Sequence, residues 1–201
     1  MNEVVIVGYS GHSYVSIEII QKMKHRVVGY FDVEPKSDNP YSLKYLGIDD
    51  KFNSDKDYFV AIGSNTIRRK VQHKLIQQLR RKALKIIDPS ATISSTALIG
   101  DGTMVSSGAI INAQCHIGDS CIINSGSIVE HECQIGDFVH VAPGAVLCGN
   151  VKVGSGSFIG AGAVIKQGVK IGENVTIGAG TIVISDIESD QKVVGNPSRK
   201  I

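Results

Sequence analysis

The chain has 201 residues, of which 42% are hydrophobic and 20% are charged, so it can form one large or two small globular domains with a buried core. Its formal net charge of +2 is too small to predict a nucleic acid or an anionic membrane as a partner. No apolar run approaches the length of a membrane span, and the first residues lack the basic start of a signal peptide. We therefore expect a cytoplasmic protein.

The first part of the chain, residues 1–88, alternates strand and helix patterns and predicts a small parallel α/β domain of the Rossmann-like kind. In such a domain the ligand binds at the carboxyl ends of the strands. Two basic runs in its second half, residues 68–70 and 80–82, are interpreted as solvated helix faces. The predicted elements are strands at 3–9, 26–32 and 58–63, helices at 14–23 and 65–82 with Asn65 as the capping residue, and a last strand at 82–88 before Pro89.

The segment "GYSGHS" (8–13) joins the first strand to the first helix. Backbone N–H groups and the helix dipole favour a phosphate at such a place. The segment is not the dinucleotide fingerprint GxGxxG, because two residues separate its two glycines and no third glycine follows. Asp32 ends the second predicted strand and "AIGSN" (61–65) ends the third, so both are expected at the same edge of the sheet.

The second part, residues 89–201, follows a different rule: every sixth residue is aliphatic. The pattern continues through sixteen successive positions without an exception, which predicts a solenoid of short strands and tight corners. Three hexads would form one triangular coil, giving about five coils at the spacing of hydrogen-bonded strands. The sixteen positions are Ile93, Ile99, Val105, Ile111, Ile117, Ile123, Val129, Ile135, Val141, Leu147, Val153, Ile159, Ile165, Ile171, Ile177 and Val183.

A small residue usually occupies the position four after each aliphatic residue, where it would fill a corner. Three of the four cysteines, Cys115, Cys121 and Cys133, hold this position. Buried packing therefore explains them better than a disulfide or a metal site does, and no metal is expected.

The hexads "IGDGTM", "IGDSCI", "VGSGSF", "IGAGAV" and "IGENVT" resemble the repeats of left-handed parallel β-helix acyltransferases. The resemblance implies an all-β, left-handed prism, a homotrimer, and acetyl-CoA bound in the groove between neighbouring prisms. No long loop interrupts the repeat to form a pocket within one prism, which agrees with a site between subunits.

Together with this prism, "VGYSGH", "FD" and "AIGSN" resemble the nucleotide-sugar acetyltransferases of the bacillosamine pathway and the related sialic acid O-acetyltransferases. The resemblance implies that the first domain binds a UDP-linked or other nucleotide-linked amino sugar. Many relatives have a second acidic residue at the position of Val33, which leaves the base and the sugar open. The residues implied in this binding are Gly11 and His12 at the phosphates, Asp32 and Gly63 nearer the nucleoside, and Asn65.

In "VEHEC" (129–133) the aliphatic and the small positions are kept, so His131 is expected to point outward near a corner. Acetyl transfer from a thioester to an amine needs an acceptor for the amine proton, and a neutral imidazole is suited to this. A neighbouring carboxylate stabilises the imidazolium that forms. The spacing alone does not decide between Glu130 and Glu132 as that carboxylate. His116, whose repeat lacks a glutamate, is interpreted as structural.

The match of "EHECxIGDFxHVxPGA" to the active-site segment of this family implies specific roles. His131 would be the general base, Glu132 the glutamate that tunes it, and the backbone N–H of Gly149 the donor to the oxyanion. By the same resemblance the residues that contact acetyl-CoA are His140, Ala161, Ala179 and Arg199.

Three functions are compatible with these residues. The first is an acetyl-CoA-dependent N-acetyltransferase that acts on the 4-amino group of a nucleotide-linked amino-dideoxy sugar and serves surface glycan synthesis. The second keeps the mechanism but acetylates a hydroxyl group of a sialic-acid-type sugar. The third is a non-catalytic trimeric scaffold that binds a nucleotide sugar, although a scaffold has no need of a histidine base.

Overall fold

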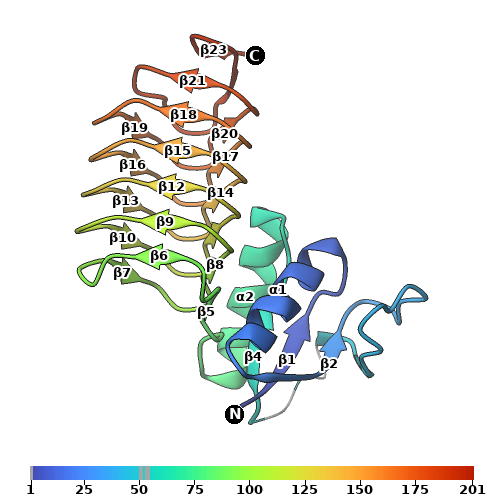
Figure 1. Ribbon diagram of the computed structural model, residues 1–201. Coiled ribbons are helices and arrows are strands. Elements are labelled where there is room, and N and C mark those ends of the chain that lie inside the picture. Colours follow the sequence, from blue (N-terminus) through green and yellow to red (C-terminus); the bar gives the residue numbers. More distant parts are fainter. Residues whose placement is uncertain (1, 50–51, 53–54) are drawn as a thin grey trace.

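A computed structural model describes residues 2–49, 52 and 55–201 of the chain. It contains an α/β unit at the N-terminus and a tall β-solenoid, with the α/β unit packed against the lower part of one side of the solenoid (Figure 1). The two-part fold predicted from the sequence is confirmed.

The α/β unit is built on a parallel sheet with the strand order β3-β2-β1-β4. Its helices begin and end differently from the prediction: Ser64 is the N-cap of α2, not Asn65, and the left-handed conformation of Arg80 ends this helix. The short strand β3 was not predicted. The elements are β1 (Glu3–Val7), α1 (Gly11–Lys22), β2 (Arg26–Phe31), β3 (Tyr45–Gly47), β4 (Asp57–Val60) and α2 (Asn65–Leu79).

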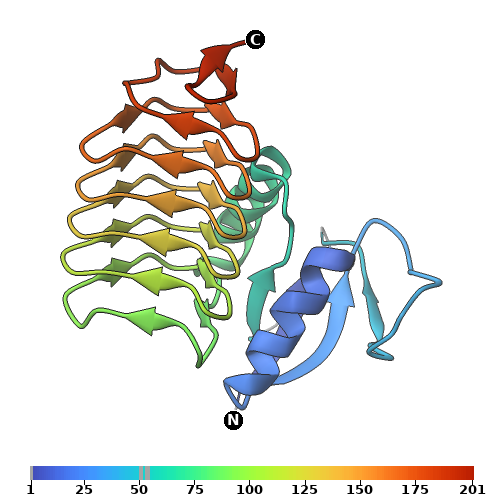
Figure 2. The ribbon, with the colours of Figure 1, turned by 45° about the horizontal axis from the view of Figure 1, so that its top comes forward.

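The two helices cover opposite faces of the sheet, and both also contact the solenoid (Figure 2). Ile17 and Ile20 of α1 belong to one apolar cluster with Ile86, Met104 and Ile122 of the solenoid. Because this cluster crosses the boundary, the two units share one core and are held in a fixed relative position.

The strand expected at 82–88 forms at Ile86–Ile87 (β5) and differs from the prediction in its partner. It pairs with β8 of the solenoid instead of the α/β sheet. Together with β22 (Lys192–Val194) at the other end, β5 makes the solenoid longer than the sixteen hexads alone predict. The proposed domain boundary after residue 88 stays a prediction.

Successive coils of the solenoid are in register at 18 residues, with His116 beside Gln134 and His140 beside Phe158. The predicted aliphatic residues point inward and form one continuous core, which also holds Cys115, Cys121 and Cys133. All four cysteines are free.

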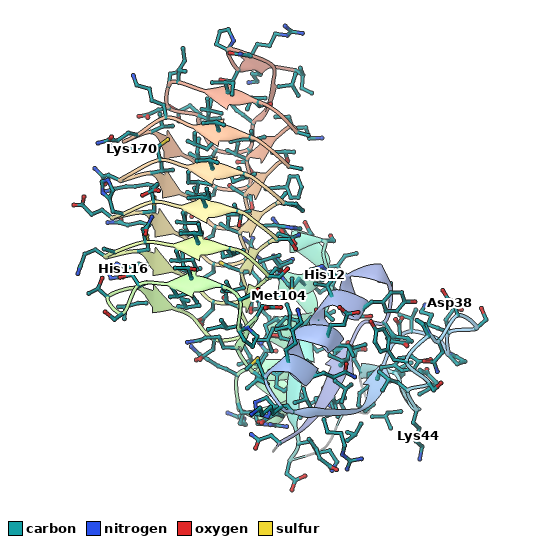
Figure 3. The ribbon with its side chains drawn as sticks, in the orientation of Figure 1. His12, Asp38, Lys44, Met104, His116 and Lys170 are labelled. Atoms are coloured by element: carbon teal, nitrogen blue, oxygen red, sulfur yellow. The ribbon has the colours of Figure 1, made fainter. Side chains whose placement is uncertain are left out.

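One side of the solenoid, which we call the covered face, contacts the α/β unit. Its lower outward side chains, Met104 and Ile122, are buried by this contact. Figure 3 shows Met104 close to His12 at the junction. The strands of this face are β5, β8 (Met104–Val105), β11 (Ile122–Ile123), β14 (His140–Val141), β17 (Phe158–Ile159), β20 (Thr176–Ile177), β22 and β23 (Arg199–Lys200).

The next side, the aliphatic face, carries a ladder of outward apolar side chains that are only half-buried. These are Ile110, Ile128, Val146, Val164 and Ile182, one from each of five successive coils. The strands are β6 (Thr92–Ile93), β9 (Ile110–Ile111), β12 (Ile128–Val129), β15 (Val146–Leu147), β18 (Val164–Ile165) and β21 (Ile182–Val183).

The third side, the polar face, is exposed and carries His116, Gln134, Lys152 and Lys170 at the equivalent outward positions. His116 and Lys170 lie at the edge of the solenoid turned away from the α/β unit (Figure 3). The strands are β7 (Leu98–Ile99), β10 (His116–Ile117), β13 (Gln134–Ile135), β16 (Lys152–Val153) and β19 (Lys170–Ile171). No helix in the described part of the chain is long and apolar enough to cross a membrane.

Candidate active site

A cavity of about 430 Å³ opens at the carboxyl ends of the α/β strands. From β1 the chain continues to β2 on one side, and it later returns to β4 on the other side of β1. Open α/β sheets bind their ligands at such a change of direction. Gly8, Asp32, Gly63 and Ser64 are among its lining residues. Gly8 has a φ of +88°, and a Cβ there would lie 2.6 Å from Ile62, so only glycine fits this turn.

Asp32 lies in this cavity with both carboxylate oxygens engaged. One oxygen accepts the backbone N–H of Tyr9 at 2.8 Å, and the other accepts that of Val33 at 2.7 Å. Lys36 lies 3.4 Å from the second oxygen. The carboxylate therefore fixes the turn after β1 and can still accept a further donor through its remaining lone pairs.

Gly11 is the first residue of α1, and His12 follows it. The His12 ring lies at the junction of the two units, with its centroid 6.3 Å from that of His140 on the covered face. A Cβ on Gly63 would lie 3.8 Å from the His12 ring, so Gly63 completes the same small cluster. Gly63, His12 and His140, predicted separately from two parts of the sequence, are thus brought together.

The imidazoles of His12 and His140 both have a pKa below the usual value for histidine. Burial, followed by the positive charge of Arg68, lowers the pKa of each imidazole to about 4. The Nε2 atom of His12 and the Nδ1 atom of His140 are buried and have no hydrogen-bond partner among the described residues.

Asn65 does not face the cavity through its amide. Its Nδ2 donates to the carbonyl oxygens of Gly156 and Ser157, at 3.0 Å each, and its Oδ1 accepts from Arg68 at 2.9 Å. The side chain therefore joins α2 to the solenoid, and the substrate contact proposed for Asn65 stays a prediction.

The second group of predicted residues lies at the corner between the aliphatic and polar faces. Here the exposed His131 places Nδ1 3.0 Å from Oε2 of Glu132. Glu130 is turned to Asn112, whose Nδ2 donates to its Oε2 at 2.9 Å. Of the two glutamates that flank the histidine in sequence, only Glu132 contacts it.

Gly149 lies one coil further along, directly against His131. A Cβ at Gly149 would lie 2.4 Å from Cε1 and 2.5 Å from Nε2 of the ring. The backbone carbonyl of His131 accepts the N–H of Asn150, which fixes the two coils here. The N–H of Gly149 itself donates to no other residue in the described part of the chain. This corner thus combines an imidazole, its carboxylate and a free backbone donor.

Comparisons with known proteins identify both parts of the chain. Residues 3–75 match the PglD N-terminal domain, and residues 114–149 and 150–185 match the bacterial transferase hexapeptide. The acetyltransferase domain of PglB from Neisseria gonorrhoeae is 31% identical, with complete coverage of both chains and a TM-score of 0.93. The chain belongs to the hexapeptide-repeat acetyltransferases with a PglD-type N-terminal domain.

Other members of this acetyltransferase family are also similar over their whole length. PerB, a perosamine N-acetyltransferase from Caulobacter crescentus solved with CoA and GDP-perosamine, is 33% identical, with 100% and 98% of the two chains covered and a TM-score of 0.92. WeeI from Acinetobacter baumannii is 25% identical, with 98% and 99% covered and a TM-score of 0.86. The PglB domain was also solved in complex with acetyl coenzyme A. A comparison with curated protein sequences gives no match.

The residues predicted to act in acetyl transfer lie on three parts of the solenoid. His131 and Gly149 lie at the corner that is opposite the covered face, and hence opposite the α/β unit of the same chain. Ala161 and Ala179 lie at the corner between the covered and aliphatic faces, in the turns after β17 and β20. Arg199 lies in β23 at the far end, exposed and paired to Val194. One chain therefore does not bring its own histidine corner to its own cavity.

Two features of this acetyltransferase were not recognised in the sequence. Arg68 was assigned to a solvated helix face, but it is only 1% exposed and lies between the two units. The ladder of the aliphatic face was also missed, although it leaves a signal: the residue before the inward aliphatic is itself Ile or Val at every third hexad from Ile110 to Ile182. Among the described residues, no group of three or more His, Cys, Asp or Glu side chains is arranged to hold a metal ion.

Proposed function

We propose that the chain transfers the acetyl group of acetyl-CoA to the 4-amino group of a nucleotide-linked amino-dideoxy sugar, with His131 as the general base. The observation that carries this proposal is the contact between His131 Nδ1 and Glu132 Oε2, which leaves Nε2 free for the substrate amine. The relatives solved with acetyl coenzyme A and with GDP-perosamine support the two substrates.

In this reaction the amine nitrogen attacks the thioester carbonyl carbon, and Nε2 of His131 accepts the amine proton. Glu132 holds the ring and stabilises the imidazolium. The N–H of Gly149 donates to the carbonyl oxygen as it becomes an oxyanion, and one such donor is worth about 3–4 kcal/mol. The carbon–sulfur bond then breaks, and the imidazolium can return its proton to the CoA thiolate.

The transfer is direct in this proposal, because His131 can activate the amine itself and no covalent acetyl-enzyme is needed. Cys133, two residues after the base, is fully buried in the solenoid core, and its thiol donates to the carbonyl oxygen of Cys148 at 3.2 Å. It serves as corner packing.

The nucleotide part of the substrate occupies the cavity at the carboxyl ends of the α/β strands. Gly11 and His12 are assigned to the phosphates because they begin α1, where backbone N–H groups favour an anion. Asp32 and Gly63 line the cavity nearer the nucleoside. The amide of Asn65 is used at the junction, so its contribution is indirect.

Acetyl-CoA is assigned to a groove formed by two chains. His140, Ala161 and Ala179 lie on or beside the covered face and supply one wall, and the basic side chain of Arg199 suits the CoA phosphates. The other wall is the corner of a second chain that carries His131.

A homotrimer with its aliphatic faces turned to the three-fold axis fits this groove. The ladder of five half-buried apolar side chains would then be covered by its own copies. The corners with His131 and with Ala161 lie on the two edges of the aliphatic face, so a rotation about such an axis brings the first corner of one chain to the second corner of the next.

The proposal is tested by the release of free thiol from acetyl-CoA with a panel of UDP-, GDP- and dTDP-linked 4-amino sugars. We expect release with one member, and a loss of about 10²–10⁴-fold in kcat for His131→Ala, the usual contribution of a general base. The matched control is His116→Ala, since His116 is also an exposed histidine on the solenoid. Release that is equal in His131→Ala and in the wild type would overturn the proposal, as would release with none of the 4-amino sugars.

A further inference from the structure

Arg68 is a fully buried cation with no counter-ion among the described residues. It lies in α2, is 1% exposed, and forms no ion pair with any carboxylate in the part of the chain that the structure describes. A buried charge without such compensation is costly, so its retention needs a reason. Burial, as the main cause, lowers the pKa of Arg68 to about 10, which still leaves it charged at neutral pH.

All five N–H groups of the guanidinium are used, and their acceptors come from both units. Nε donates to the carbonyl of Ser120 at 2.8 Å, and Nη2 donates to that of Phe138 at 3.1 Å; both residues belong to the solenoid. Nη1 donates to the carbonyls of Ile62 and Gly63 at 3.0 and 3.1 Å, in the loop after β4. The fifth bond is the one from Nη2 to Asn65 Oδ1. One side chain thus ties the edge of the nucleotide cavity to the coils around β14.

These coils carry His140, two residues after Phe138, and His12 faces it from α1. Asn124 fixes the tautomer of His140: its Oδ1 accepts the N–H of Ser125 at 2.8 Å, so its Nδ2 points to Nε2 of His140 at 3.1 Å and donates to it. The proton of neutral His140 is therefore on Nδ1, the ring nitrogen on the side of the Gly63 backbone.

We propose that Arg68 is a positioning residue that clamps the edge of the nucleotide cavity to the coil of His140 and holds the rings of His12 and His140 beside each other at the junction of the two units. The proposal rests on the proposed function for its kinetic part only. The groups that face the pair are Arg68, Asn124, the ring of Phe158 and the backbone of Gly63, and none of them is a carboxylate. The cation therefore acts on both rings without a competing negative charge.

The test compares Arg68→Met, which keeps the length of the side chain but not its charge, with Lys70→Met, an exposed charge on the same helix. The first measurement is the NMR titration of the His12 and His140 rings in the intact protein without substrate. In Arg68→Met we expect both titrations to move to higher pH, while Lys70→Met leaves them unchanged. Unchanged titrations in folded Arg68→Met would overturn the proposal.

The second measurement is kcat/KM for acetyl transfer. A misplacement of about 1 Å can cost about 10²-fold, so we expect a loss of that order in Arg68→Met at an unchanged oligomeric state. If Arg68→Met does not fold, Arg68→Lys takes its place in the test. Arg68→Lys keeps the charge but cannot make five directed hydrogen bonds. The titrations of the two histidine rings should therefore be unchanged, and kcat/KM should fall. Wild-type kcat/KM in Arg68→Lys would overturn the clamp. Absence of transfer in the wild type would refute the proposed function, and the titrations would still test Arg68.

Discussion

The imidazole of His131 lies directly against the backbone of Gly149, one coil further along the solenoid, and leaves no room for a side chain there. A Cβ at Gly149 would lie 2.4 Å from Cε1 of the ring. Such a distance forces the ring to move, because the backbone of the coil is held by hydrogen bonds on both sides. The close approach is what lets one base and one backbone donor act on the same carbonyl group.

Gly149→Ala should therefore displace the base and reduce kcat by about 10²-fold, the cost typical of a misplaced catalytic group. The control is the same substitution in the His131→Ala background, where no ring is left to displace. There the added methyl group should change kcat little. A methyl group that costs the same in both backgrounds would show that Gly149 acts independently of His131.

The two glutamates beside His131 provide an internally matched pair. Glu132→Gln should lower kcat by about tenfold or more, because the imidazolium loses the carboxylate that contacts Nδ1. Glu130→Gln should have a small effect, since Glu130 contacts Asn112 instead. Steady-state kinetics of both variants at one pH decides the point. A larger loss for Glu130→Gln would contradict the assignment.

The aliphatic face predicts how the subunits assemble. Val146→Lys should give a monomer, because a trimer would bring three lysines to the axis and bury their charges. Gln134→Lys adds the same side chain to the exposed polar face and should leave the assembly unchanged. Light scattering after gel filtration measures both. A Val146→Lys protein with the mass of the wild type would place the interface on another face.

The buried histidines predict a pH dependence of stability. The pKa values of His12 and His140 are about 4 in the folded chain and about 6.5 when unfolded. Between these values only the unfolded chain binds the protons. The free energy of unfolding should therefore have its full value above pH 6.5. It should fall as the pH is lowered towards 4, by about 1.4 kcal/mol per pH unit for each ring.

Denaturant unfolding between pH 4 and pH 7.5 at a fixed protein concentration measures this effect. The double variant His12→Asn and His140→Asn should have a flatter profile over the same range, since neither site then titrates. An identical slope in the variant and the wild type would show that groups other than these two histidines cause the loss of stability.

The sequence predicts the solenoid well because its constraint is local. Each coil must place an aliphatic residue inward and a small residue at a corner, so the period is written directly along the chain. The partner strand of β5 could not be predicted, because the residues Ile86 and Ile87 suit a strand in either sheet. Their place in the solenoid goes with the packing of Ile86 against α1, which the local sequence does not show. The burial of Arg68 could not be predicted either. A run of basic residues is typical of a solvated helix face, and the acceptors that bury Arg68 come from distant segments.

The residues of the candidate site could be proposed from the sequence, but their arrangement in space could not. The segment around His131 contains a candidate base and two candidate carboxylates. The contact between Glu130 and Asn112 joins two coils and turns Glu130 away from His131, which the sequence does not show. Likewise His12 and His140 are 128 positions apart in the sequence and meet only because α1 packs on the covered face.

In the proposed trimer, His131 of one chain acts on a substrate held by the α/β unit of another. Mixed trimers test it most directly. One chain carries His131→Ala and the other carries His12→Ala and His140→Ala, each with a different purification tag, and each forms an inactive homotrimer on its own. In every mixed trimer one of the three sites combines an intact corner with an intact cavity, so we predict about one third of the wild-type activity. Mixed trimers without any activity would show that both halves must come from the same chain and would contradict the account.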